Sequence, residues 1–183
     1  QPKITRVASR PVQGITLYTD ASSSTSTAAV VWKEEQQWRK VVETDLSLSV
    51  QMLEARAMVL AMILFVDVPC NIVTDSIFVY GLVQKMYYAG WAGTPAALML
   101  EHALQQRKAP CFVIKVTSHT SSDKGLFLGN RKADEAAKGL WTLQEARRLH
   151  QELHLGAQAL AKHCKIPKTQ ARQVVATCPY CQR

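Results

Sequence analysis

The alternation of apolar and polar positions predicts strands in the first part of the chain and helices in most of the rest. Residues 15–32 hold two strand-forming runs around a Ser/Thr-rich turn, which is typical of a β-hairpin. Residues 36–46 form a third strand-like run. In residues 49–65 the apolar side chains recur with the period of an α-helix, so the first helix is predicted there.

Strands and helices alternate in the segments that follow. Thr94 and Pro95 suit the N-cap and the first position of a helix. The short helix that closes this part is predicted to begin at Asn130, after a polar loop. The predicted elements are a buried strand (70–76), a second helix (76–88), a third helix (94–107), a strand (111–116), the polar loop (117–130) and the last helix (130–140).

This order of elements predicts an α/β domain with a mixed sheet of five strands and flanking helices. Three consecutive strands favour an antiparallel meander, and the later alternation with helices favours parallel additions. Gly139 ends this unit, and a new helix begins afterwards with a capping box formed by Thr142 and Glu145. The domain boundary is therefore predicted at residues 139–142.

Composition and charge narrow the class of protein only a little. A chain of 183 residues suits one domain with room for a small second one. The 48% share of hydrophobic residues is that of a globular protein, and no apolar run approaches the ~20 residues of a membrane span. The net charge of +8 is uneven, since residues 141–183 carry seven Lys and Arg against two Asp and Glu. A basic balance is compatible with nucleic acid but does not establish it.

The five cysteines favour a reducing compartment. Their number is odd and no secretory signal accompanies them, so a disulfide framework is not expected. Cys70 and Cys111 each open an apolar strand-like run, and both are predicted to be buried core thiols.

Four carboxylates occupy unusual places in the predicted first domain. Asp20 ends the first strand of the hairpin, and Asp75 ends the fourth strand, where a parallel strand feeds its helix. Glu54 lies inside the first helix with apolar neighbours on its own face. Asp134 lies one turn into the helix that begins at Asn130. Taken singly, the three aspartates have structural alternatives as a turn residue, an N-cap and a partner of the helix dipole.

Together, the four acids favour a metal site. Carboxylates that share one site repel one another unless a cation offsets their charge. Oxygen ligands at this density suit Mg²⁺ or Mn²⁺. Two such ions about 4 Å apart form the usual arrangement for in-line cleavage of a phosphodiester.

The motifs "YTDAS", "SVQMLEARA", "VTDSIFV", "SHT" and "GNRKADEAA", in this order and spacing, resemble those of retroviral RNase H, especially the alpharetroviral (avian sarcoma–leukosis) type. The resemblance covers residues 15–140 and implies an RNase H-like fold. It implies hydrolysis of the RNA strand of RNA–DNA hybrids during reverse transcription, by an enzyme that works in the virion core and the host-cell cytoplasm. Residues 1–14 would be a linker from the preceding reverse transcriptase region, whose polymerase and connection domains would be partners.

The resemblance also implies roles for individual residues. Asp20 would bridge both metal ions, Asp134 would complete one metal site, and Glu54 and Asp75 the other. His119, in the polar loop, would assist proton transfer or product release, although a loop histidine taken alone is usually a solvated surface residue.

Three further residues are implied as nucleic-acid contacts. Gln51 resembles the glutamine that reads sugar edges in the minor groove of the hybrid, where the 2′-hydroxyl distinguishes RNA. Ser76 would contact the backbone, although N-capping alone would explain it. Asn130 is assigned to the same group.

The chain departs from the family pattern at the substrate-binding side. Ala21 stands where many members have Gly, and Phe78 where several have a Tyr that contacts the DNA strand. Some members carry an extra basic helix after the second helix, whereas no Lys or Arg lies between Lys85 and Arg107 here. Phosphate contacts supply much of nucleic-acid affinity, so weak binding of hybrid is expected without the polymerase.

The C-terminal part carries a zinc-ligand pattern. His150 and His154 share one helical face, and Cys178 and Cys181 form a Cys-x₂-Cys turn. A unit as small as residues 141–183 also needs a stabilising device beyond its core. Four protein ligands leave no place for a catalytic water, so the predicted Zn²⁺ is structural.

The same spacing resembles the HHCC zinc-binding N-terminal domain of retroviral integrase. This implies a small all-α helix-turn-helix domain over residues 141–183, with Pro167 opening its last helix. His163 and Cys164 are alternative ligands that fit the spacing less well. The resemblance implies self-association and the integrase core as a partner.

Two other interpretations of the first domain stay open. A retroelement-derived domain could keep the fold as a nucleic-acid or protein binding module without catalysis. Exonucleases and resolvases also place acid clusters on such sheets. The presence of all four acids, with the "GNxxAD" helix and the His-containing loop, favours RNase H.

Overall fold

The computed structural model describes residues 7–89, 93–117, 124–139 and 143–182. It divides the chain into two compact units, Gln1–Lys138 and Gly139–Arg183, each described by itself. His119 and Thr142 lie outside the described residues, so the loop histidine and the capping box stay predictions.

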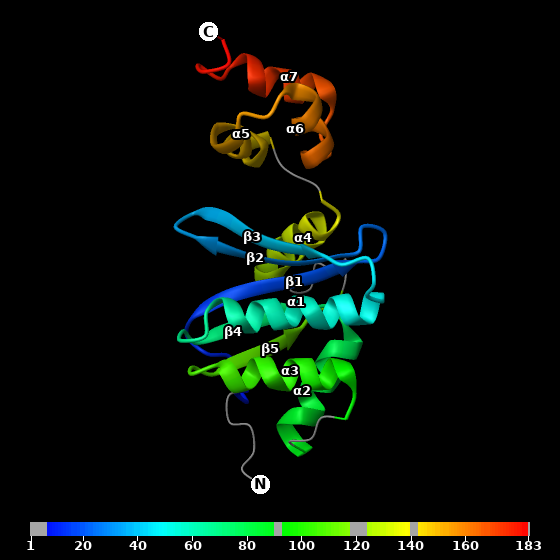
Figure 1. Cartoon of the computed structure of the whole chain (residues 1–183). Coiled ribbons are helices and arrows are strands. Elements are labelled where there is room, and N and C mark those ends of the chain that lie inside the picture. Colours follow the sequence, from blue (N-terminus) through cyan, green and yellow to red (C-terminus); the bar gives the residue numbers. More distant parts are fainter. Residues whose placement is uncertain (1–6, 90–92, 118–123, 140–142, 183) are drawn as a thin grey trace. The chain divides into compact units, whose positions relative to one another are not determined.

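The first unit is built on a mixed five-stranded sheet in the order β3-β2-β1-β4-β5, which confirms the predicted fold class (Figure 1). β1 pairs antiparallel with β2 and parallel with β4. β2 pairs antiparallel with β3, and β4 pairs parallel with β5. The strands are β1 (Ile15–Ser22), β2 (Thr27–Glu34), β3 (Gln37–Thr44), β4 (Cys70–Thr74) and β5 (Cys111–Lys115).

The two faces of the sheet bury different helices, and strand alternation decides which side chain goes where. Leu17 joins a large core with α1 (Val50–Leu64), α2 (Ile77–Ala89) and α3 (Pro95–Gln106). Tyr18, the next residue along β1, faces the opposite way and packs with α4 (Lys124–Ala137). Asp20 lies two residues beyond Tyr18, and therefore on the α4 face.

Several local predictions are confirmed at the start of helices and strands. Thr94 caps α3 with Pro95 in its first turn, as predicted. The Ser49 side chain caps α1, a cap that was not among the predictions. Cys70 and Cys111 are free thiols with no exposed surface, as expected of core residues.

The start of α4 differs from the prediction. The helix begins at Lys124 and not at Asn130, because the segment expected as a polar loop supplies its first turns. Asp134 therefore lies in the C-terminal half of a 14-residue helix. The alternative of a first-turn acid favoured by the helix dipole is wrong, since the dipole is unfavourable to negative charge at that end.

The segment before β1 packs along the β5 edge of the sheet. Val7 is buried and forms a parallel bridge with Cys111. The Asn71 side chain holds the backbone of Val12 through two hydrogen bonds, of 2.9 and 2.8 Å.

Arg107 is fully buried and serves as an internal anchor for the end of α1. Its guanidinium donates to the carbonyl oxygens of Met62 (2.7 Å) and Phe65 (3.0 Å), at the C-terminal end of that helix. It also donates to the carbonyl oxygens of Val68 (2.8 Å) and Ala109 (3.2 Å). These bonds satisfy helix-end carbonyls that have no partner inside the helix.

We expect Arg107→Met to lower the free energy of unfolding by about 3 kcal/mol, because buried carbonyls would lose charged donors. Arg56→Met is the control. Arg56 pairs with Glu43 at 2.6 Å near the surface, and loss of such a pair costs about 1 kcal/mol or less. Urea unfolding followed by tryptophan fluorescence reports on this unit, which holds three of the four tryptophans. Equal losses in the two variants would contradict the anchor role.

The second unit consists of α5 (Leu143–Leu153), α6 (Ala157–Cys164) and α7 (Lys168–Ala176). Pro167 is the N-cap of α7, and Lys165 ends α6 in the left-handed conformation. A small core between the helices is formed by Ala146, Leu160, Ala161, Cys164, Ala171 and Val174. Among the described residues of both units, no helix is long and apolar enough to cross a membrane.

Candidate active site and metal centre

Asp20 is the partly buried centre of the acid cluster in the first unit. It lies on the central strand β1, opposite Ala29 of β2, and its Oδ1 accepts a 2.9 Å hydrogen bond from the Ala21 backbone N–H. A carboxylate at this partly buried position loses part of its hydration, which favours partners within the protein.

Two acids from other elements interact with Asp20, and a third interacts with one of these two. The charges of Asp75, just after β4, and of Asp134, on α4, both act on the Asp20 carboxyl, and Asp134 also forms a hydrogen bond with it. Glu54, half-buried on α1, is hydrogen-bonded to Ser76 and feels the charge of Asp75. The fold therefore brings together the four acids singled out from the sequence, although they are up to 114 positions apart in the chain.

Burial and mutual repulsion make ionisation of this cluster costly. Desolvation, followed by the negative charges of Asp75 and Asp134, raises the pKa of Asp20 to about 8. Desolvation also raises the pKa of Glu54, against the hydrogen bond from Ser76. Buried carboxylates that raise one another's pKa in this way gain stability from a bound cation.

The donor set fits a hard divalent ion. It consists of carboxylate oxygens from one strand, one strand end and two helices, which are the ligands that Mg²⁺ and Mn²⁺ prefer. One cation of the protein already lies there: the Lys138 amino group is 3.1 Å from Oδ2 of Asp134, one helical turn away. Lys138 was not among the predicted site residues, although its i,i+4 spacing from Asp134 was a usable signal.

The residues predicted as nucleic-acid contacts differ in exposure. Gln51 is exposed near the start of α1. Ser76 is buried, and its hydroxyl accepts a 3.1 Å hydrogen bond from the Val79 N–H as well as bonding Glu54. Asn130 is buried in α4, and its Oδ1 has no hydrogen-bond partner among the residues that the structure describes. Asn130 therefore keeps an unused acceptor, whereas Ser76 is occupied within the protein.

The second unit gathers the predicted zinc ligands into one cluster. One ligand atom from each of His150, His154, Cys178 and Cys181 lies within 4.8 Å of the other three. Cys181 Sγ is 3.3 Å from His150 Nε2, and Cys178 Sγ is 3.6 Å from His154 Nδ1. Zinc with ordinary bond lengths to nitrogen and sulfur gives tetrahedral edges of about 3.3–3.8 Å, so the cluster has the right size.

Local structure prepares these ligands for an ion. His150 is buried on α5, and His154 has a positive φ of 49° one turn later, just after the helix ends. Burial acts to raise the pKa of the Cys178 thiol, but hydrogen bonds from the N–H groups of Cys181 and Tyr180 outweigh it and lower the pKa. A lowered pKa favours the thiolate that zinc requires.

The alternative ligands do not belong to this cluster. Cys164 is buried in the core between the helices. His163 precedes it on α6 and is exposed. The four residues of the predicted set are those that the structure brings together.

Known families match both units. The RNase H family matches residues 12–140, which is more than half of the chain. The integrase zinc binding domain matches residues 146–183. Zinc suits the His₂Cys₂ cluster of that domain, and the RNase H family uses divalent Mg²⁺ or Mn²⁺.

Curated relatives support the same assignment over nearly the whole chain. The Gag-Pol polyproteins of Rous sarcoma virus subgroup B (strain Schmidt-Ruppin) and of avian leukosis virus subgroup A (isolate RSA) are each 46% identical to it over 96% of its residues. The Gag-Pro-Pol polyprotein of sheep pulmonary adenomatosis virus is 31% identical over 98%. The chain spans only about a tenth of these relatives, namely 11%, 11% and 10% of their lengths. It belongs to the RNase H family, in the form found in retroviral Pol polyproteins, where an integrase zinc-binding domain follows.

Proposed function

We propose that this chain hydrolyses the RNA strand of RNA–DNA hybrids in a metal-dependent reaction at the cluster of Asp20, Glu54, Asp75 and Asp134. The observation that carries the proposal is the interaction of Asp75 and Asp134 with the partly buried Asp20 and of Glu54 with Asp75, within the part of the chain that matches RNase H. The reaction joins water to the phosphodiester and leaves a 3′-hydroxyl and a 5′-phosphate.

The protein's part in this mechanism is to hold negative oxygens rigidly where cations are needed. Bound Mg²⁺ or Mn²⁺ would stabilise charge on the phosphate and lower the pKa of an attacking water. Asp20, Glu54, Asp75 and Asp134 would hold the ions through their carboxylate oxygens. The Ser76 hydroxyl orients Glu54 through a hydrogen bond, and the Lys138 amino group offsets part of the charge of Asp134. His119 would assist proton transfer or product release.

A labelled RNA–DNA hybrid tests this proposal. The protein with Mn²⁺ or Mg²⁺ should cut the RNA strand and spare the DNA strand, and Asp75→Asn should lose about 10³-fold or more of the rate, since a catalytic metal site supplies several kcal/mol and 1.36 kcal/mol is tenfold. Glu43→Gln, in a peripheral ion pair, should retain the activity. Tight binding without cutting, in the unmodified chain, would instead support a non-catalytic binding module.

The affinity for hybrid is expected to be weak in the absence of a polymerase. No Lys or Arg lies between Lys85 and Arg107, so the segment that is basic in some relatives supplies no phosphate contacts. A titration of hybrid into Asp75→Asn should therefore show a weak and strongly salt-dependent Kd. Inserting three lysines after Tyr88 should tighten binding and steepen the salt dependence, whereas three glutamines at the same place should not. Tight binding by the unextended chain would contradict the expectation.

The zinc unit is proposed to connect this enzyme to a larger assembly. In a Pol polyprotein the neighbours would be the polymerase and connection domains on one side and the integrase core on the other. Self-association through the zinc unit is a further proposed contact. The virion core and the host-cell cytoplasm are the proposed locations, since Pol proteins work inside the virion and the host cell.

A further inference from the structure

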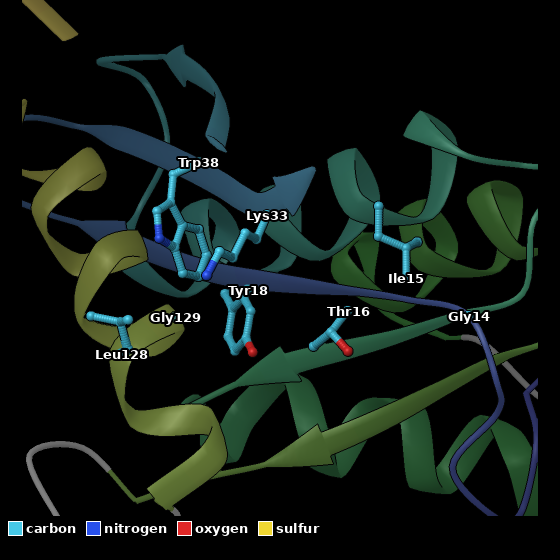
Figure 2. A pocket seen from close by; sticks show the side chains of 8 residues that line it. All are labelled: Gly14, Ile15, Thr16, Tyr18, Lys33, Trp38, Leu128 and Gly129. Carbon is cyan, nitrogen blue, oxygen red and sulfur yellow. The ribbon is translucent and has the colours of Figure 1, made fainter. Parts of the chain in front are cut away.

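A pocket of about 380 Å³ lies on the α4 side of the sheet, outside the acid cluster (Figure 2). Its volume falls in the range of sites that hold small organic ligands, about 300–1,000 Å³. The residues that line it are Gly14, Ile15, Thr16, Tyr18, Lys33, Trp38, Leu128 and Gly129. None of them belongs to the predicted metal or nucleic-acid contacts.

The pocket exists because α4 covers only part of the sheet face. Gly129 brings the helix backbone directly onto Tyr18: a Cβ at this position would lie 2.2 Å from the tyrosine ring. Beyond this contact Thr16 and Lys33 continue along β1 and β2, where Thr16 is partly exposed and Lys33 is exposed. Any side chain at position 129 would displace Tyr18 and alter the pocket wall.

One side of the pocket is an aromatic surface. The rings of Tyr18 and Trp38 have centroids 5.9 Å apart and an interplanar angle of 60°. Tyr18 is buried, whereas Trp38 is only partly covered and turns part of its ring toward the pocket (Figure 2). Such surfaces bind planar ring systems, because every nucleobase has a face that stacks on an aromatic side chain.

The pocket also has a positive rim. Lys33 and Trp38 are register partners on β2 and β3, and Figure 2 shows the lysine amino group beside the indole ring. Lys33 is exposed, and it is the only charged side chain among the lining residues. The hydroxyl-bearing side chains of Thr16 and Tyr18 project from the same face of β1.

We propose that this pocket binds a nucleotide, with the base against Trp38 and Tyr18 and the phosphate at Lys33. A purely apolar ligand would leave the lysine without a role, and an aliphatic anion would leave the aromatic surface unused. Tyr18 precedes Asp20 by two residues, about 7 Å along the strand, so an unpaired end of a strand held at the acid cluster could reach the pocket. A free nucleotide offers the same chemistry.

Chemical-shift mapping tests the site directly. 5′-AMP is titrated into the full chain, with zinc retained and without added Mg²⁺ or Mn²⁺, and the Gly129 amide and Trp38 indole N–H are followed. Both should shift together in a saturable way. Lys33→Gln should weaken AMP binding about fivefold or more and leave adenosine binding unchanged, whereas Trp38→Phe should weaken both. Lys85→Gln, an exposed lysine on α2, is the matched control and should change neither.

Binding measurements with hybrids distinguish an unpaired strand end from a free nucleotide as the ligand of this pocket. Tighter binding of a hybrid with an unpaired adenosine end than of a blunt hybrid, lost in Lys33→Gln, identifies the strand end as the ligand. Binding of AMP without this preference identifies a free-nucleotide site. Three results would overturn the proposal. They are chemical-shift changes confined to Asp20 and Ala21, equal affinities of Lys33→Gln and the parent chain for AMP, or no chemical-shift changes at millimolar AMP. Each readout stands whether or not the chain cuts RNA.

Discussion

Asp20→Asn is expected to abolish cleavage and, in the absence of divalent metal, to stabilise the folded protein at alkaline pH. The loss of activity should match that of Asp75→Asn, because Asp20 is the centre of the proposed ligand set. The gain in stability has a separate cause. The pKa of Asp20 is raised to about 8 by desolvation and by Asp75 and Asp134, whereas an unfolded aspartate titrates near 3.8.

The direction in which the stability changes with pH follows from proton linkage. Between pH 4 and pH 8 the unfolded chain has lost the Asp20 proton and the folded protein still holds it, so the stability contributed by this group falls as the pH rises. An asparagine at position 20 has no ionisable group, so the free energy of unfolding of the variant does not fall in this way as the pH rises. The variant should exceed the parent by on the order of 2 kcal/mol at pH 8.5, and the two should converge near pH 4.

Thermal unfolding of both proteins across this pH range, with zinc retained and Mg²⁺ absent, measures the effect. Asp45→Asn is the control, because hydrogen bonds from Ser47 lower the pKa of Asp45 and its replacement should bring no gain. Added Mg²⁺ should stabilise the parent and leave Asp20→Asn nearly unchanged. A variant that is less stable than the parent at pH 8.5 without metal would show that Asp20 is not electrostatically strained.

Removal of zinc is expected to unfold the second unit and to leave the first unit folded. The core of the second unit is small, and it contains three alanines besides Leu160, Val174 and Cys164. Structural zinc contributes about 10–16 kcal/mol in finger-sized peptides, far more than this core can supply. Cys181→Ser should have the same effect as a zinc-specific chelator, because three ligands hold the ion much less tightly.

Amide spectra resolve this outcome, since signals of Leu143–Arg183 should collapse while those of the sheet persist. Cys164→Ala is the matched control: it removes a buried thiol from the same unit but leaves the four ligands in place. That variant should still bind one zinc ion per chain and remain folded, with a modest loss of stability. Dispersed signals from α5 and α7 after chelation would contradict a zinc-dependent fold.

The sequence predicted the sheet and most helices because their signals are local. Alternation, capping residues and the helical period of residues 49–65 lie within a few positions of the elements that they define. The beginning of α4 was missed because its first turns contain Gly125 and Gly129, which weaken a helix in isolation. Gly129 is compensated by close packing on Tyr18, a contact between distant parts of the chain.

In the candidate sites, too, some features follow from local sequence signals and others from contacts between distant parts of the chain. The four acids and the four zinc ligands could be selected by residue type, spacing and family motif, and the fold brings each set together. The raised pKa of Asp20 depends on contacts with Asp75 and Asp134 that no local pattern contains, whereas the pairing of Lys138 with Asp134 follows an i,i+4 spacing that the sequence does show. Nothing in the sequence indicated the role of Arg107, because the four carbonyl oxygens around its guanidinium come together only in the tertiary structure.

The chain before β1 also bears on the solubility of this protein. β5 is the last strand of the sheet, and a bare strand at a sheet edge offers backbone groups on which another molecule can assemble. Val7 and Ala8 occupy part of that edge through the bridge to Cys111 and a 2.7 Å hydrogen bond from the Ala8 N–H to the Cys111 carbonyl. A shortened chain that begins at Ile15 would expose this edge and uncover Cys111. A shortened domain whose first residue was chosen from the catalytic motifs alone would thus keep its active site but would tend to aggregate edge to edge.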